Sequence, residues 1–371
     1  MTMKRLFNRC LVAMAAVCAL GCSAQGVKIT VTNPGAQDRA SETVSACFEC
    51  LGRALPGLTG DNCTLIDSEG KQVPCQVVDG RLYWQASVPS GKKVRYTVKT
   101  GTPETFETRA YSRHVPERFD DFAWENELIA GRIYGPALNT PRTLGSDIWV
   151  KSTPRLVIDE WFARDDYHHN HGEGMDCYKV ANTLGGGALA PVWGKKVIIG
   201  DNWQTLEHVC DGPVMSRTTL TYSFPVGEME VSLKREFTVE AGSRFVKNVM
   251  TYEAPCDSLD VILGGMDHGV KFLVNGCHWV AFCEAASDYT KDPELDGDIY
   301  VGLVMDPAVK CRFKRIGSHV GLVARIATGR PVSVWTASGW SQGGVESPKA
   351  WAEYVEAFRN AVFSPLTVEL K

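Results

Sequence analysis

Short runs in which hydrophobic and polar residues alternate dominate the chain and predict a mainly β protein. Between Val27 and about Lys99 four such runs are separated by Gly, Pro, Asp and Ser, which is typical of antiparallel strands. The predicted strands are 27–32, 72–78, 82–88 and 94–98. We therefore expect a small N-terminal β-sandwich over residues 25–100.

A longer series of strands begins at about Lys195, with no helical pattern between them. A run of strands without intervening helices indicates a large antiparallel β-sandwich. We assign residues 101–371 to this second domain. Its predicted strands are 217–224, 228–238, 244–252, 258–264, 279–282 and 301–305.

Two segments have the apolar spacing of an amphipathic helix. In residues 116–130, Phe119, Phe122 and Ile129 fall on one stripe, and Asn126 lies on the same side. A buried asparagine there needs hydrogen-bond partners or belongs to a site. Residues 347–358 open with a Ser N-cap followed by Pro at the first helical position. The sequence predicts a helix in both segments.

The N-terminus has the pattern of a secretory signal peptide. Three basic residues precede an apolar run from Cys10 to Leu20, which is too short to span a membrane. Cleavage follows residue 24, or a lipobox makes Cys22 a lipid anchor; we favour the first because Ala19 stands where a lipobox usually has Leu. We expect residues 1–24 to be a signal peptide, no transmembrane segment, and a periplasmic protein or outer-membrane lipoprotein.

The charge balance argues against a nucleic-acid partner. The chain has 39 Lys and Arg against 43 Asp and Glu, a formal charge of −4. Loss of the signal peptide leaves 36 basic residues against 43 acidic ones, so the charge becomes −7. Nucleic-acid binders normally carry a basic excess. An anionic ligand would therefore have to be held by local arginines.

Ten of the 13 cysteines lie outside the signal segment, and the periplasm permits disulfides. Cys47 and Cys50 have the spacing of a redox or zinc pair, but no second close pair follows, which favours a structural role. Because the two alternate poorly along one strand face, we expect either of them to pair with Cys63 or Cys75. Cys177 is expected to pack in the interior.

The stretch Tyr167–Asp176 contains three of the eight histidines and two carboxylates. Its two glycines make a continuous helix improbable, so we expect a loop or strand end, where catalytic side chains are commonly held. Imidazoles and carboxylates together suit proton transfer or metal binding. The competing interpretation is a polar surface loop.

Five strings in the central block have a specific resemblance: Asp121–Asn126, Arg132–Ala137, Gly145–Lys151, Tyr167–Tyr178 and Leu184–Gly187. In this order they resemble a family of exported Bacteroidota proteins that carries a domain-of-unknown-function label and occurs in polysaccharide-utilisation gene clusters. The strings after Asp211–Val214 and around Glu240–Phe245 resemble the galactose-mutarotase-like supersandwich of many lyases and hydrolases. The resemblance covers nearly all of the mature chain, but a fold does not fix a function.

The resemblance implies carbohydrate chemistry, with β-elimination at a non-reducing-end glucuronic acid as the leading reaction. The product would be a 4,5-unsaturated uronate, formed by a lyase or dehydratase. Such a reaction needs a cation or donors at the carboxylate, a base at C5 and an acid at the leaving oxygen. We expect a uronate-containing oligosaccharide or polysaccharide as the substrate and no required cofactor.

Candidate residues follow for each role. The catalytic candidates are His168, His171, Tyr134, Tyr167 and Glu173. The substrate-binding candidates are Arg113, Arg132, Trp124, Glu125, Asn126, Asp147 and His268, of which an arginine can bind a carboxylate bidentately. If calcium or zinc is bound, the candidate ligands are His169, His171, Glu173 and Asp176, although they lack the spacing of a zinc-protease motif.

Each choice has a structural alternative. Arg132 could form an internal ion pair, Trp124 could lie in the core, Tyr134 could be a packing ring, and His268 could pair with a neighbouring acid.

Two other function classes stay open at this point. A glycoside hydrolase or a mutarotase-like epimerase would need a carboxylate pair, such as Glu125 with Glu173 or Asp176. A non-catalytic glycan-binding protein would use aromatic platforms such as Trp335, Trp340 and Trp351. Under the elimination hypothesis we expect His171→Ala to abolish turnover.

Overall fold

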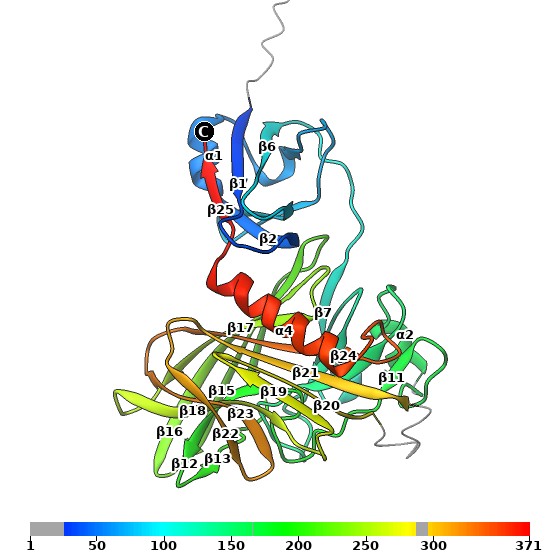
Figure 1. Ribbon diagram of the computed structural model, residues 1–371, viewed down its shortest axis with the longest axis vertical. Helices are drawn as coiled ribbons and strands as arrows, with labels where there is room; N and C mark the ends of the chain where they lie inside the picture. Colours follow the sequence, from blue (N-terminus) through cyan, green and yellow to red (C-terminus); the bar gives the residue numbers. More distant parts are fainter. Residues whose placement is uncertain (1–25, 165, 287–295) are drawn as a thin grey trace, which may run out of the picture.

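The computed structural model describes residues 26–164, 166–286 and 296–371. The predicted signal peptide and Cys22 lie outside these residues. The described chain is mainly β, built from antiparallel sheets with a few short helices, as predicted (Figure 1). Within these ranges no helix combines the length and the apolar character needed to cross a membrane.

The N-terminal region is a sandwich of two small sheets around its own core. One sheet has the strand order β25-β1-β6-β3 and the other β2-β5-β4. Trp84, Leu65 and Val98 are buried between them. The predicted strand at 72–78 is confirmed only from Cys75 onward. The elements are β1 (Val27–Thr32), β2 (Arg39–Cys47), α1 (Phe48–Ala54), the 3₁₀ turn η1 (Gly60–Asn62), β3 (Cys63–Ile66), β4 (Cys75–Val78), β5 (Arg81–Val88), β6 (Lys93–Thr100) and β25 (Thr367–Leu370).

The last strand of the chain, β25, completes the first of these sheets. It pairs antiparallel with β1, with Ile29 opposite Leu370 and Thr32 opposite Thr367. The chain thus returns to its beginning, and in Figure 1 the red C-terminal strand lies beside blue β1. Pairing along this edge of β1 leaves fewer unpaired backbone groups exposed.

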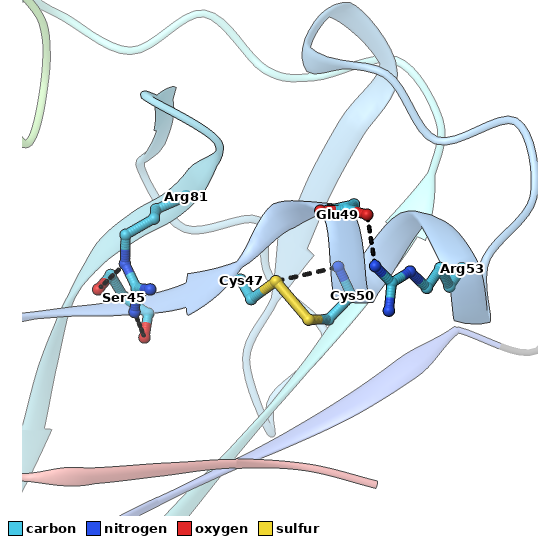
Figure 2. Close-up of a disulfide and its surroundings, with 6 residues drawn as sticks. All are labelled: Ser45, Cys47, Glu49, Cys50, Arg53 and Arg81. Atoms are coloured by element: carbon cyan, nitrogen blue, oxygen red, sulfur yellow. Dashed lines mark hydrogen bonds and ion pairs between the residues drawn. A yellow bond between two sulfur atoms is a disulfide. The ribbon is translucent and has the colours of Figure 1, made fainter.

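The disulfide expectation is wrong in its pairing. Cys47 bonds to Cys50 (Figure 2). Cys63 and Cys75 are free thiols. Strand β2 ends at Cys47 and helix α1 begins at the next residue, so one helical turn brings Cys50 back to a Cα–Cα distance of 5.2 Å. A strand-based argument missed this pair because the second cysteine lies on a helix. Cys177 is buried, as predicted.

Two larger sheets share the main hydrophobic core. The eight-stranded sheet has the order β14-β15-β16-β17-β24-β21-β20-β19, and the five-stranded sheet has the order β13-β12-β18-β23-β22. All six strands predicted after residue 195 are confirmed. The bounds are β12 (Ala188–Trp193), β13 (Lys196–Val197), β14 (Thr205–Cys210), β15 (Met215–Val226), β16 (Met229–Glu240), β17 (Phe245–Glu253), β18 (Ser258–Met266), β19 (Phe272–Gly276), β20 (Trp279–Ala285), β21 (Asp298–Met305), β22 (Cys311–Ile316), β23 (His319–Ala327) and β24 (Val332–Trp340).

A further five-stranded sheet, β11-β10-β9-β8-β7, lies between the N-terminal strands and the large sheets in sequence. It carries most of the polar residues singled out above. Its elements are β7 (Ala110–Val115), β8 (Asp121–Asn126), β9 (Ala130–Ile133), β10 (Asp147–Lys151) and β11 (Gly174–Asp176), with the 3₁₀ turn η2 (Pro116–Arg118) and helix α2 (Ile158–Arg164).

The helix predicted over residues 116–130 is wrong. The segment forms the turn η2 and strand β8, and β9 begins at its last residue, Ala130. All six residues of β8 are buried. A strand covered on both faces loses the alternation of polar and apolar residues, so its apolar positions mimic helical spacing. Phe119 and Asp120, both in the left-handed region with φ of 51° and 61°, end the turn before β8.

The C-terminal helix is confirmed and runs farther than predicted, as α4 (Pro348–Phe363). The Ser347 side chain accepts a hydrogen bond from Ala350 N at 3.1 Å, which caps the helix. Trp351 and Val355 pack against Tyr300 and neighbouring residues of β20 and β21. Figure 1 shows α4 between the N-terminal sandwich and the large sheets.

Candidate functional site

A buried arginine surrounded by carboxylates forms the centre of the candidate site. Arg132 lies on β9, between β8 and β10, and its neighbours in the sheet bring acids to the same face. Its Nε donates to Asp147 Oδ2 at 2.9 Å and its Nη2 to Asp176 Oδ2 at 2.8 Å. Its Nη1 lies 3.5 Å from Asp121 Oδ2. The Arg132 side chain is only 3% exposed, so the guanidinium is committed to these internal partners.

The cluster contains more negative than positive charge, and this sets the protonation of its acids. Burial raises the pKa of Asp147 well above its usual range, and the neighbouring Asp176 raises it further, although Arg132 acts in the opposite direction. Burial likewise raises the pKa of Asp121. Asp147 is therefore suited to hold a proton at neutral pH, which is what a general acid requires.

Tyr134 lies next to that acid. Its hydroxyl is 3.4 Å from Asp147 Oδ2, and its ring stacks over the Arg132 guanidinium at 5.2 Å. Burial, with the charge of Asp147 second, raises the pKa of Tyr134. The phenol thus stays protonated and can donate.

His168 borders the cluster and has a defined tautomer. Its Nδ1 lies 3.0 Å from the carbonyl oxygen of Asp176, which can only accept, so Nδ1 carries the hydrogen. The lone pair of the neutral ring is then on Nε2. Burial lowers the pKa of His168, which keeps the imidazole neutral, and its side chain is 29% exposed. These are the properties of a general base.

A second arginine near this histidine was not singled out from the sequence. Tyr167 OH accepts hydrogen bonds from Arg132 Nη1 at 3.2 Å and from Arg118 Nε at 3.3 Å. The Nη1 of Arg118 is buried without a hydrogen-bond partner. The charge of Arg118 also contributes to lowering the pKa of His168. Arg118 lies in the turn η2 before β8, and its closeness to Tyr167 depends on tertiary contacts that the sequence does not show.

His268 belongs to a second group of polar side chains, which lies at the ends of the two large sheets. Its Nδ1 donates to Glu284 Oε1 at 2.9 Å, and its backbone N donates to Glu284 Oε2 at 3.1 Å. The His268 ring contacts the edge of Tyr178 at 5.1 Å. Burial raises the pKa of Tyr178 well above its usual range, followed by Glu284 and, more weakly, Asp147.

Two members of this group, Glu284 and Tyr178, have features in the sequence that could have singled them out. Glu284 is the one acidic residue in the otherwise apolar strand Trp279–Ala285, and such a residue is either paired or functional. Tyr178 follows Asp176 at the same spacing as Tyr134 follows Arg132. Each tyrosine lies just beyond the end of its strand, Tyr134 after β9 and Tyr178 after β11. His268 pairs with Glu284 across the fold rather than with its sequence neighbour Asp267, which binds Arg315.

The segment Leu184–Gly187 joins the two groups. Gly185 forms a bridge with Ser146, directly before Asp147, and Gly186 N donates to Ser146 O at 2.8 Å. On the other side Met266 N donates to Gly185 O at 2.8 Å, two residues before His268. A Cβ on Gly185 would lie 2.4 Å from Ser146 O, so the close approach requires glycine.

Several residues predicted to bind substrate have structural surroundings instead. Glu125 is buried and accepts hydrogen bonds from Lys151 Nζ and from the backbone N of Val157, each at 2.8 Å. The Asn126 amide is bonded to Glu240 O and Ser243 O at 2.7 Å, and its oxygen accepts from Leu128 N and Ile129 N. Trp124 packs on Phe237 in the core. Arg113 pairs with Glu117 and Asp159, at 2.6 Å each.

The exposed part of the histidine stretch stands apart from the buried cluster. His169 and His171 both pair with Asp166, and Glu173 is held by Arg155 at 2.7 Å. Asp176 instead faces Arg132. The four predicted metal ligands therefore do not converge, and no group of three or more His, Cys, Asp or Glu able to hold a metal ion occurs in the described ranges.

The lining of a small pocket beside the histidine stretch includes Asp166, His169, His171 and Glu173. Of the predicted aromatic platforms, Trp335 is partly buried. Trp340 and Trp351 are buried, and their indole nitrogens donate to Asp296 O and Val301 O. A cavity of about 420 Å³ opens on the sheet containing β22 and β23 and is lined by none of the candidate residues. The charged side chains that line that cavity are mainly basic, and no histidine or tyrosine lines it, so it lacks an oriented base and acid, and we place the candidate catalytic site at the Asp147 cluster.

The chain is similar to one protein in sequence and to two solved structures in fold. The chain is 27% identical over 282 residues, 70% of each chain, to "Uncharacterized protein P7" of Formosa agariphila. Its fold is similar to that of a protein in glycosyl hydrolase family 38 from Enterococcus faecalis, with a TM-score of 0.53 and 11% identity. It is also similar to an alpha-mannosidase from Enterococcus faecalis V583, with a TM-score of 0.53 and 10% identity.

These alignments cover 94% of the present chain and 47% and 46% of the two solved chains, so it spans about half of their length. At such identity the likeness concerns the fold alone. The family described as "Domain of unknown function (DUF4861)" matches residues 31–368, which include every element of the candidate site, and the chain belongs to this family.

Proposed function

We propose that the protein is a carbohydrate-active enzyme that performs β-elimination on a non-reducing-end glucuronic acid residue. One observation carries the proposal: a neutral histidine of defined orientation borders a buried cluster. That cluster holds a protonated carboxyl group beside a protonated phenol. His168 supplies the base, and Tyr134 with Asp147 behind it supplies the acid. The fold likeness to carbohydrate-processing enzymes supports the substrate class.

The proposed step is balanced without a cofactor. His168 Nε2 removes the proton from C5, which is acidified by the adjacent carboxylate. The C4–O4 bond breaks, a C4=C5 double bond forms, and Tyr134 protonates the leaving oxygen, so that the 4-hydroxyl of the terminal residue departs as water. Asp147 then returns a proton to Tyr134 across the 3.4 Å contact. No electron acceptor is needed, because oxidation at one carbon is matched by reduction at its neighbour.

Arg118 is our choice for recognition of the uronate carboxylate, in place of Arg113 and Arg132. The guanidinium of Arg132 has three acidic neighbours, and that of Arg113 has two. Arg118 donates to Tyr167 OH and lies over the ring of Phe119, and within the described residues its Nη1 makes no hydrogen bond. A guanidinium with a spare nitrogen can bind a carboxylate oxygen.

The test is to incubate the purified protein with glucuronate-terminated oligosaccharides and record the ultraviolet absorbance of the conjugated C4=C5 carboxylate. A rise with time, without new reducing ends, is the expected result. Heat-inactivated protein and an oligosaccharide with a neutral terminal sugar are the controls. New reducing ends without the absorbance change would overturn elimination in favour of glycoside hydrolysis, the second candidate that the fold likeness favours.

We further propose that the protein is exported to the periplasm or outer membrane and acts in polysaccharide degradation. The signal-like N-terminus motivates this proposal. The Cys47–Cys50 disulfide supports it, because disulfides persist in oxidising compartments. Fractionation of expressing cells, with and without residues 1–24, tests the location.

A further inference from the structure

We propose that the cavity on the sheet β13-β12-β18-β23-β22 is a second binding site, separate from the candidate catalytic site, for a polyanionic glycan chain. The inference goes beyond the elimination reaction, since it concerns binding of polymer and requires no turnover. Its basis is a concentration of positive charge on an acidic protein, combined with a hollow that a chain can occupy.

Four basic side chains line the cavity, and one acid accompanies them. Lys310, Arg312, Lys314 and Arg325 contribute the cations and Asp260 the acid. Arg325 lies 3.6 Å from Asp260, so this pair is largely neutral. Within the described ranges the other three cations form no ion pair. Three uncompensated cations converge here, on a chain whose formal charge is −4.

The strand register places the cations on one face. Arg312 and Lys314 are two residues apart on edge strand β22, so they point to the same side at a spacing of about 7 Å. Arg312 lies opposite Val323, and Lys314 lies opposite Gly321, which contributes no side chain. Because Gly321 has no side chain, the surface of the sheet stays low beside Lys314. Val192, Val323 and Ile316 supply apolar lining between the charges.

This composition fits a glycan that carries carboxylate or sulfate groups at regular intervals. The cations can contact successive anionic groups while apolar side chains cover the C–H faces of the sugars. A nucleic acid fits less well, because no aromatic side chain lines the cavity to stack with bases. The competing structural explanation is that basic residues protect an edge strand from pairing with other chains.

The experiment measures binding of the full mature chain to three polymers: polygalacturonate (carboxylated), dextran sulfate (sulfated) and unmodified dextran (neutral). Affinity electrophoresis and titration calorimetry provide the readout at low and high salt. We expect binding to at least one anionic polymer, none to dextran, and a loss of binding as salt rises. The two anionic arms distinguish carboxylate from sulfate recognition.

The decisive variant is Arg312→Gln/Lys314→Gln, with Lys92→Gln/Arg95→Gln as a control that removes the same charge from the N-terminal sandwich. We expect the first variant to bind the anionic polymer about tenfold more weakly and the control to bind like the wild type. Arg312→Lys/Lys314→Arg should retain binding. Equal weakening by the control, unchanged binding by the first variant, or equally strong retention of double-stranded DNA would overturn the proposal.

The outcome is independent of the elimination assay. Turnover of a short, soluble uronate oligosaccharide should be the same in the wild type and in Arg312→Gln/Lys314→Gln, because neither residue belongs to the candidate catalytic site. Failure of elimination in both proteins would contradict the proposed function and leave the polymer-binding result intact. Matching thermal unfolding curves establish that the variants are folded.

Discussion

At the scale of single residues, the buried polar groups are of two kinds. Some form hydrogen bonds that stabilise the fold, and others have shifted pKa values that suit proton transfer. Asn126 and Glu125 bond to backbone and lysine partners and thereby hold β8 in place. His168 and Tyr134 instead border an acid whose charge is disfavoured by burial. Perturbed protonation next to a partly exposed side chain is the pattern of functional sites.

We expect His168→Ala to lower elimination turnover by roughly 10²–10⁴-fold, since it removes the proposed general base. Thermal stability should change little, because the side chain is partly exposed. His171→Ala is the matched control. In place of the loss of turnover expected from the sequence, this variant should retain turnover, because His171 is exposed and pairs with Asp166. Initial rates from the absorbance assay provide the measurement. The opposite ranking of the two variants would move the base to His171.

Acid should destabilise the protein through His319. Its Nε2 accepts a hydrogen bond from Leu184 N at 3.0 Å, and burial holds its pKa below the usual range. The unfolded chain protonates more readily, so the contribution to stability is present above the ordinary imidazole pKa of about 6.5 and is lost as pH falls through the folded pKa.

A comparison of variants isolates this effect, because Asp147, with its raised pKa, titrates in the opposite sense. The His319→Gln amide oxygen can accept from Leu184 N without titrating. We expect the difference in free energy of unfolding between wild type and His319→Gln, measured with urea, to shift in favour of the variant as pH falls from 7.5 toward 5. A constant difference would show that His319 does not titrate on unfolding.

At the scale of elements, the candidate site depends on how β9, β10 and β11 pair. Asp147 lies opposite Arg132, and Asp176 lies opposite Trp149, so the ladder sets the distances among the charged groups. Gly174 belongs to the last residue pair of the β10–β11 ladder. It has φ of +126°, and an added Cβ would lie 1.9 Å from Val150 O.

Gly174→Ala is therefore expected to displace β11 and with it Asp176 and His168. Gly172→Ala is the control in the same loop, since Gly172 also has a positive φ of +95° but nothing within 4 Å of an added Cβ. Backbone strain should cost about 1–3 kcal/mol in each. The clash should add about 1–3 kcal/mol in Gly174→Ala alone. Urea unfolding measures both, and equal losses would contradict the steric argument.

At the scale of the whole molecule, the chain closes on itself through its last strand. We propose that residues 25–100 and β25 form one folding unit and that the remaining sheets form another. The N-terminal sandwich has its own core, which includes Leu366 directly before β25. Its contact with the rest of the chain includes hydrogen bonds from Gln76 to Asp211 O and Met215 O.

Removal of residues 367–371 should destabilise the N-terminal sandwich while the large sheets stay folded. The deletion takes away the antiparallel partner of β1 and exposes its backbone edge. Amide hydrogen exchange should rise in β1 and β6 but not in β16 or β17. Removal of Lys371 alone is the control, as it leaves all four residue pairs of the β1–β25 ladder in place. Uniform destabilisation of the molecule would contradict the two-unit proposal.

The sequence by itself determined the mainly β class, most of the strands and helix α4, because alternation and capping are local properties of the chain. It also pointed to the region of the candidate site, since His168, Tyr134 and Asp147 were all singled out. Tertiary structure alone decided that 121–126 is a strand buried on both faces, that Cys47 pairs with Cys50, and that Arg132 is buried beside three acids.

Only the tertiary structure also identified three further residues near the candidate site: Arg118, Tyr178 and Glu284. The physical reason is the range of the interactions. A strand or a cap depends on residues within a few positions. Burial, ion pairing and the resulting pKa shifts depend on which distant strands become neighbours, as when the Gly185 junction brings Asp147 toward His268.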